Sequence, residues 1–138
     1  MKTIVNTVIA LFSLLMMFSC KGPSLFDGFD VHPKTISARA DGGEFTITSD
    51  PFDQVYILVN GKSFETEMFT GQTDGKAYSV SAGWISVSFT PVNGAKPTTV
   101  KVLVDKNDSE NLREAVIIVS NVVDGDGRVK IRQEMFHE

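Results

Sequence analysis

The sequence has few of the residues that cross-link, bind zinc or catalyse. It contains one cysteine, Cys20, so no disulfide can form within the chain. Its two histidines, His32 and His137, lie far apart in the sequence, which excludes a Cys/His zinc cluster and argues against a histidine-based catalytic triad. No glycine-rich phosphate loop follows a strand and opens a helix. We therefore expect a protein that is not an enzyme, with no catalytic residues, no metal and no cofactor.

The chain also lacks a basic excess. It carries 13 Lys and Arg against 17 Asp and Glu, a formal net charge of −4. Proteins that bind nucleic acid need a basic surface to release the counterions of the phosphates. The charge therefore predicts that nucleic acid is not a partner, and that any contact with a membrane does not depend on attraction to anionic lipid.

The amino-terminal segment is apolar but too short to cross a bilayer. Lys2 precedes a run at 4–18 that is broken by two threonine or serine residues and one asparagine, whereas a spanning helix needs about 20 apolar residues. The run ends in Met17-Phe18-Ser19-Cys20, which resembles a bacterial lipobox. The resemblance implies a lipoprotein signal peptide at 1–19 and lipid attachment at Cys20. An ordinary secretory signal and an uncleaved membrane helix are the alternatives.

A lipid on Cys20 would make the membrane a partner through the anchor. The expected location is then the cell envelope, at the outer membrane, with the periplasmic or surface face undecided. Residues 20–34 are expected to form the lipidated N-terminus and a tether, because Gly22, Pro23, Gly28 and Pro33 interrupt any regular period.

Residues 35–138 alternate between apolar and polar with a period of two, which is typical of strands with one buried face. The alternating segments are separated by turn signals, including Asn60-Gly61, a strong hairpin pair because both positions tolerate positive φ. Strands are expected around 64–69 and 76–81, and the nearly all-apolar run 113–120 is typical of a central strand covered on both sides. The pattern predicts an all-β fold, an immunoglobulin-like antiparallel β-sandwich of about seven to nine strands.

With the strands in this order, residues 35–134 resemble the BACON domain family, immunoglobulin-like modules of Bacteroidetes-type secreted proteins. The likeness is carried by five segments: Gly42–Ser49, Gly83–Ser88, Thr99–Val104 with Asn107, Arg113–Val119 and the closing Val129–Gln133. Phe52 stands where the family usually has a tryptophan, and residues 55–82 are longer than its usual middle section. The resemblance implies a carbohydrate-binding role.

Two aromatic residues are candidates for ligand binding, since sugars pack their C–H groups on flat, exposed rings. In its segment, Trp84 shares a face with Ser86 and Ser88, while Tyr56 lies opposite Val55 and Ile57. A structural role is the alternative for each ring: Trp84 could cap the end of the core, and Tyr56 shares its face with Leu58.

Several charged groups have both a functional and a structural interpretation. Glu65 and Glu67 share one face of an expected strand, and like-charged neighbours on a solvated face explain them without catalysis. The run 105–110 offers oxygen ligands near the spacing of a calcium loop but lacks its glycine, and Asp124 with Asp126 is a weaker candidate; a solvated turn is the default for both. Arg128, Lys130 and Arg132 form an outward basic stripe, which we interpret as the protection of a sheet edge.

The sequence thus predicts a non-enzymatic cell-envelope lipoprotein with one BACON-like sandwich, serving as a glycan- or mucin-associated accessory or adhesion module. The alternative is a structural spacer or a protein-assembly module with no small ligand, whose partner would be an envelope protein.

Overall fold

The computed structural model describes residues 28–71, 75–92 and 94–137. The predicted signal peptide at 1–19 and the predicted lipid attachment at Cys20 lie outside these residues. Within the described residues, no helix is long and apolar enough to span a membrane.

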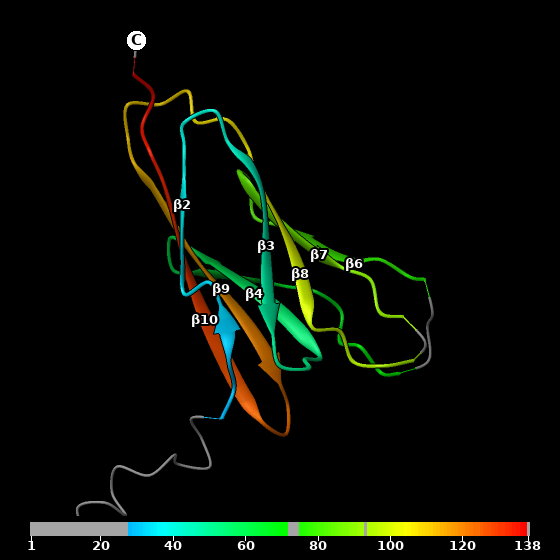
Figure 1. Cartoon of the computed structure of the whole chain (residues 1–138). Coiled ribbons are helices and arrows are strands. Elements are labelled where there is room, and N and C mark those ends of the chain that lie inside the picture. Colours follow the sequence, from blue (N-terminus) through cyan, green and yellow to red (C-terminus); the bar gives the residue numbers. More distant parts are fainter. Residues whose placement is uncertain (1–27, 72–74, 93, 138) are drawn as a thin grey trace, which may run out of the picture.

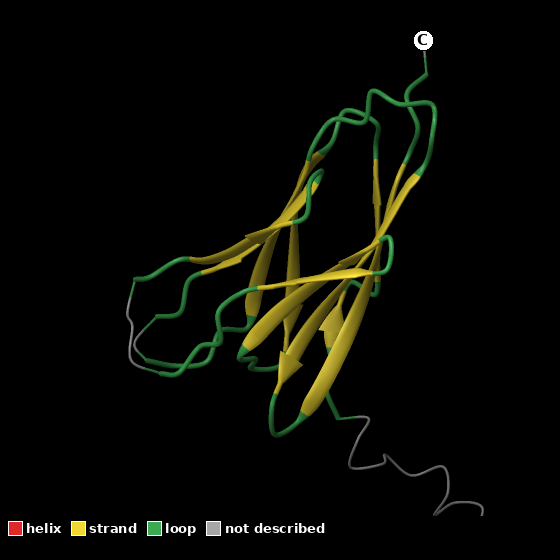
Figure 2. Ribbon diagram, turned by 180° about the vertical axis from the view of Figure 1, so that it is seen from behind, coloured by secondary structure: helices red, strands yellow, loops and turns green. Residues whose placement is uncertain are grey.

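The described chain contains ten short strands, one more than the upper bound of the predicted range, and no helix (Figure 2). In chain order they are β1 (Val31–His32), β2 (Thr35–Ala38), β3 (Gly43–Ser49), β4 (Gln54–Val59), β5 (Lys62–Glu65), β6 (Tyr78–Ser81), β7 (Ile85–Phe89), β8 (Thr99–Val104), β9 (Arg113–Asn121) and β10 (Gly125–Gln133).

The strands form two five-stranded sheets that face each other as a β-sandwich (Figure 1). The first sheet has the order β1-β3-β8-β7-β6, and the second has the order β2-β10-β9-β4-β5. The predicted all-β sandwich is therefore confirmed. One pairing departs from the antiparallel expectation, because β2 runs parallel to β10. The chain passes from the first sheet to the second at Pro33 and keeps its direction, which sets β2 beside the last strand.

The sandwich begins earlier than the sequence suggests. Val31, in β1, is fully buried and Phe29 is 6% exposed, so packing starts at Phe29 and the expectation of a tether up to residue 34 is wrong for this stretch. Both side chains lie over Gly127: a Cβ on that glycine would stand 2.5 Å from Val31 Cγ1 and 3.1 Å from Phe29 Cδ1. Because Gly127 has no side chain, Phe29 and Val31 can pack directly on β10.

The predicted hairpin is confirmed and a longer strand is not. Asn60 and Gly61 have φ of 51° and 75° and join β4 to β5. The strand expected to continue to Phe69 ends at Glu65 instead, because Thr66 turns inward: its N–H donates to Val55 O and its carbonyl accepts from Gln54 Nε2.

The core lies between the two sheets and is made of alternate residues, as expected. At one side it is aromatic: the Phe89 ring packs edge-on to Phe52, with centroids 5.0 Å apart, and is stacked on Tyr78 at 5.0 Å. Phe52 is completely buried, so the residue that replaces the usual tryptophan of the family serves as core.

The strand β9 lies in the middle of the second sheet, between β10 and β4. Its inward residues Ala115, Ile117 and Val119 are buried, whereas Val116 and Ile118 on the other face are only half-buried. In the described part of the chain one face is covered by the first sheet, so the prediction of cover on both sides is wrong for the outer face.

The basic stripe Arg128, Lys130 and Arg132 lies on β10, which is not an edge strand. Lys130 pairs with Thr35 of β2 on one side and with Val116 of β9 on the other. The interpretation of the stripe as edge protection is therefore wrong for Lys130 and Arg132, because β2 covers the edge beside them, whereas Arg128 lies before the first residue that pairs with β2. Alternation fixes the face on which a side chain lies but does not reveal which strand is outermost.

A buried carboxamide joins two loops at the C-terminal end of the sandwich. This end comprises residues 39–42, 82–84, 105–112 and 134–137. Gln133 is fully buried, and its Nε2 donates to the carbonyls of Asp105 at 2.7 Å, Arg39 at 3.1 Å and Ala40 at 3.5 Å. A buried amide such as this one needs hydrogen-bond partners within the protein, because no bulk water reaches it.

Asn107 provides a second buried carboxamide beside the first. Its Nδ2 donates to Asn111 O at 2.9 Å and to Glu134 O at 3.0 Å, while its Oδ1 accepts from Ser109 Oγ at 2.7 Å. Its backbone N–H donates to Ala40 O at 2.7 Å. Together the two amides hold the loops at this end to the C-terminal segment.

We expect Gln133→Met to lower the free energy of unfolding by about 1–3 kcal/mol, because Asp105 O loses its donor and the carbonyls of Arg39 and Ala40 each lose one of two donors while the volume stays similar. Urea denaturation followed by circular dichroism measures the change. The exposed neighbour offers a matched control, since Glu134→Gln should change stability by less than about 0.5 kcal/mol. Equal stability of the two variants would refute the role given to Gln133.

Candidate functional site

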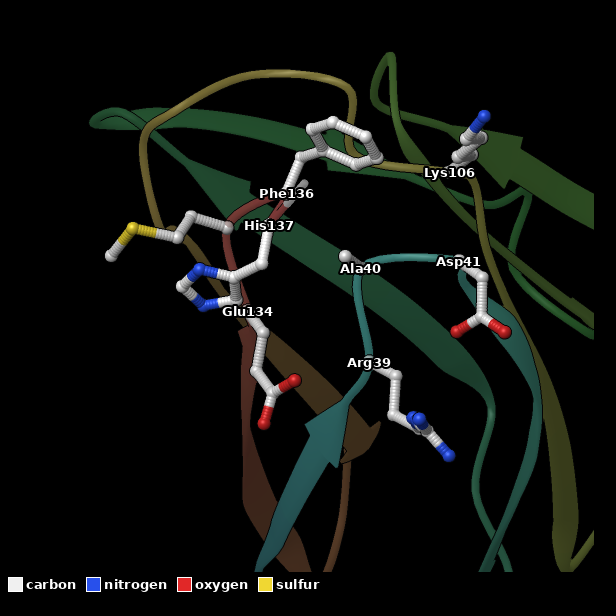
Figure 3. Close-up of a pocket in the computed structure, with 8 residues that line it drawn as sticks. Arg39, Ala40, Asp41, Lys106, Glu134, Phe136 and His137 are labelled. Atoms are coloured by element: carbon white, nitrogen blue, oxygen red, sulfur yellow. The ribbon is translucent and has the colours of Figure 1, made fainter.

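The C-terminal end of the sandwich holds a pocket of about 260 Å³ (Figure 3). The C-terminal segment after β10 supplies one wall, the loop after β2 supplies another, and the loop after β8 adds one residue. The lining residues are Arg39, Ala40, Asp41, Lys106, Glu134, Met135, Phe136 and His137.

The pocket combines an apolar ring with groups of both charges. Phe136 is 39% exposed, and its backbone N–H donates to Ser109 O, which holds the segment in place. Arg39 and Asp41 come from the facing loop. Such a mixture can hydrogen-bond a polar ligand and pack against its apolar side. His137 lies here, whereas His32 is in β1, where the chain enters the sandwich (Figure 1), so the fold does not bring the two histidines together.

Trp84 lies beside this end, just before β7, and is partly buried against the core. The Arg113 guanidinium lies over its ring, 5.6 Å from the centroid, and Arg113 Nη1 also donates to Lys106 O at 3.3 Å. The Trp84 carbonyl accepts from Asp105 N–H at 2.8 Å. Trp84 therefore links the core to the loop that borders the pocket, and a cation occupies one face of its ring.

Tyr56 lies in the other sheet, so the structure does not join the two predicted aromatic residues into one platform. It is half-buried on the outer face of β4, opposite Ile118 of β9 and Glu65 of β5. Its hydroxyl donates to Gln54 Oε1 at 2.8 Å. This hydrogen bond fixes the ring at the surface, where one side remains accessible.

The acidic candidates do not form a paired site. Glu65 belongs to β5, but Glu67 lies beyond the strand and pairs with Lys76 at 2.6 Å. This hydrogen bond, together with the charge of Lys76, lowers the pKa of Glu67, and the same pair raises the pKa of Lys76. Both groups are exposed, so the pair is a surface ion pair.

In the loop at 105–110, the calcium candidate, two of the possible ligands already have partners within the protein. Asn107 points inward and its Oδ1 already accepts from Ser109, while Asp108 pairs with Lys106 at 3.2 Å. Across the ranges that the structure describes, no three acidic, histidine or cysteine side chains cluster as a metal site would require.

A family model matches part of this chain. Residues 74–134, which run from the segment before β6 to the residue after β10, match the model named BACON, described as "Putative binding domain, N-terminal". The protein is BACON-domain-like. The match includes Trp84, Asn107, Arg113 and Gln133, the residues that organise the C-terminal end.

Two solved structures share the fold of this BACON-like domain. One is a Bacteroides ovatus GH5 xyloglucanase in complex with a XXXG heptasaccharide, with a TM-score of 0.51 and 20% identity; it covers 79% of this chain, and the chain spans 19% of it. The other is the NMR structure of a protein from Bacteroides thetaiotaomicron, with a TM-score of 0.52 and 15% identity, covering 76% of this chain and 79% of that one. No curated protein matches the chain.

Sequence reasoning did not find the pocket of this BACON-like domain. Its walls come from residues near 40, 106 and 136, which alternation assigns to turns or to the chain end. The sequence held one signal, Gln133 in the closing strand motif. An amide at an apolar position of the alternation indicates a buried group that hydrogen-bonds to nearby loops.

We expect Trp84→Ala to lower the free energy of unfolding by about 1–3 kcal/mol, below the 3–5 kcal/mol typical of a fully buried aromatic residue, because the ring is only partly buried. Arg113→Gln, which removes the cation from the ring, should cost less than about 1 kcal/mol. Thermal denaturation gives both values, and Trp84 fluorescence reports the second change. If Trp84→Ala unfolds like the parent protein, the ring has no structural role.

Proposed function

We propose that this protein is a non-enzymatic lipoprotein of the cell envelope, anchored at Cys20 to the outer membrane, whose BACON-like sandwich serves as a glycan- or mucin-associated accessory or adhesion module. The description of the matching family as a binding domain supports a binding role rather than catalysis. The lipobox-like segment before Cys20 supports the anchor.

The observation that carries the proposal is the position of the two chain ends. The described chain enters at the end where Phe29 packs over Gly127, and it leaves at the opposite end, beside the pocket (Figure 1). A lipid attached eight residues before Gly28 would therefore hold the entry end near the membrane. The pocket and Trp84 would face away from it, where a ligand outside the membrane can reach them.

The glycan part of the proposal rests on likeness. A domain of this fold aligns with part of a xyloglucanase whose structure contains a heptasaccharide. The exposed Phe136 ring, among hydrogen-bonding groups of the pocket, and the half-buried Tyr56 ring are the surfaces on which a sugar could pack.

A second candidate function is a spacer or protein-assembly module with no small ligand. The same opposite placement of the chain ends favours it, because such a domain lengthens the distance between a membrane anchor and whatever lies beyond the sandwich. The Arg113 guanidinium over Trp84 also favours it, since the ring is already engaged within the protein.

The anchor predicts a specific effect of Cys20→Ser. The variant should remain an unprocessed precursor, because the thiol that takes the lipid is gone, and globomycin should cause the parent protein to accumulate as a precursor as well. Immunoblotting of membrane fractions measures both, with Ser24→Ala as the control that is processed normally. Normal processing of the Cys20→Ser protein would contradict the anchor.

The binding role predicts that the full-length protein in detergent binds at least one glycan among mucin and plant polysaccharides. Isothermal titration measures the affinity, and Phe136→Ala, which removes an exposed ring without emptying the core, should weaken it at least fivefold. Val123→Ala, an exposed apolar residue in the turn between β9 and β10, is the control. If no glycan binds, the spacer function replaces the binding role.

A further inference from the structure

The outer face of the second sheet carries two adjoining stripes. The first, the cationic ladder, consists of Arg128, Lys130 and Arg132 on β10, all exposed. The second, the apolar stripe, lies on the next two strands and consists of the half-buried Tyr56, Leu58, Val116 and Ile118. Neither stripe is required by the fold, because both point away from the first sheet.

The cationic ladder is regular and largely unpaired. Alternate residues of a strand lie about 7 Å apart, so the three charges form a line along β10. Among the residues that the structure describes, none of the three forms an ion pair with an acidic group. Glu114 is opposite Arg132, and Asp126 precedes Arg128 by two residues on the same face of β10, so Lys130 is the cation with no acidic residue directly opposite it on β9 or next to it on this face of β10.

The apolar stripe extends the ladder sideways across the sheet. Arg128 is opposite Ile118, which is opposite Tyr56, and the row ends at Glu65. The next row contains Lys130, Val116 and Leu58. Neighbouring strands lie about 5 Å apart, so a Tyr56 ring held by Gln54 stands within about 10 Å of the ladder.

Edge protection does not explain the ladder. A charged stripe discourages unwanted pairing when it lies on an outermost strand. Here β2 pairs with β10 from Lys130 to Gln133 and occupies the edge beside Lys130 and Arg132, although not beside Arg128. Lys130 and Arg132, which have a neighbouring strand on both sides in a chain with a net charge of −4, therefore need another reason.

We propose that this face binds a linear anionic polysaccharide along β10, with its acidic groups on Arg128 and Lys130 and a sugar ring on Tyr56. This rests on the proposed carbohydrate-associated function and names the ligand class. A repeating polyanion matches a line of evenly spaced cations, and an aromatic ring beside them packs against the apolar side of a sugar. Hydroxyls of Thr35 and Ser63 end the row that contains Lys130 and add hydrogen-bonding groups.

Anionic lipid fits the same charges less well. The ladder runs along the side of the sandwich, from the entry end toward Gln133, rather than across the end at which the described chain begins (Figure 1). A bilayer held at the entry end would contact this face near the turn between β9 and β10 and not along the length of β10. A flexible chain can instead lie along the whole strand.

The test compares heparin and polygalacturonate with neutral xyloglucan, using the full-length protein in detergent and isothermal titration at several salt concentrations. We expect the anionic glycans to bind, and Arg128→Gln/Lys130→Gln to weaken them at least tenfold and to reduce the slope of log K against log salt by about one to two. The matched control, Lys62→Gln/Lys101→Gln, removes the same charge elsewhere and should change binding less than twofold. Tyr56→Ala should weaken binding severalfold and leave the salt slope unchanged.

The outcomes separate this inference from the proposed function. Binding of xyloglucan but not of the anionic glycans overturns the inference and leaves a carbohydrate-associated module. Absence of binding to every glycan overturns both. The inference also fails if the double variant binds anionic glycans as the parent does, or if the ladder is needed for binding to phosphatidylglycerol vesicles and not to glycans.

Discussion

The arrangement of the C-terminal end depends on one buried carboxamide. Gln133 is the last residue of β10, and its Nε2 reaches carbonyls from two loops that belong to different parts of the chain. A hydrocarbon side chain at this position would leave Asp105 O without this donor, and Arg39 O would keep only the hydrogen bond from Gly42 N–H. The pocket therefore exists because a polar group closes the sandwich at an end where alternating apolar residues stop.

Much of the fold could be predicted because the alternation of apolar and polar residues along a strand indicates which side chains are buried. Ile36, Ile47, Val102 and Ile131 lie at apolar positions of this alternation and are buried. The same alternation does not indicate which strands are neighbours in a sheet. It therefore missed that β10 lies inside the second sheet, and that Phe29 and Val31 extend the core beyond the expected boundary. Those features depend on contacts between residues about 100 positions apart, such as Val31 over Gly127.

The candidate sites were less predictable for the same physical reason. The pattern placed Tyr56 on the outer face of its strand, but the groups beside the two rings come from distant strands: Arg113 over the tryptophan and Ile118 beside the tyrosine. The basic stripe was visible in the sequence, but only the strand order shows that β2 pairs with the part of β10 that carries Lys130 and Arg132. The sequence shows where the charges lie along the chain, whereas the strand order determines which groups lie beside them.

The parallel pairing of β2 with β10 has a mechanical consequence. The beginning of the described chain lies near the start of β10, and the chain terminates beyond its other end. Tension between the two ends would load the β2–β10 hydrogen bonds in shear, so that they resist together rather than opening one at a time. A module pulled by flow or by a moving substrate would thus carry the load through the four residue pairs of the β2–β10 ladder.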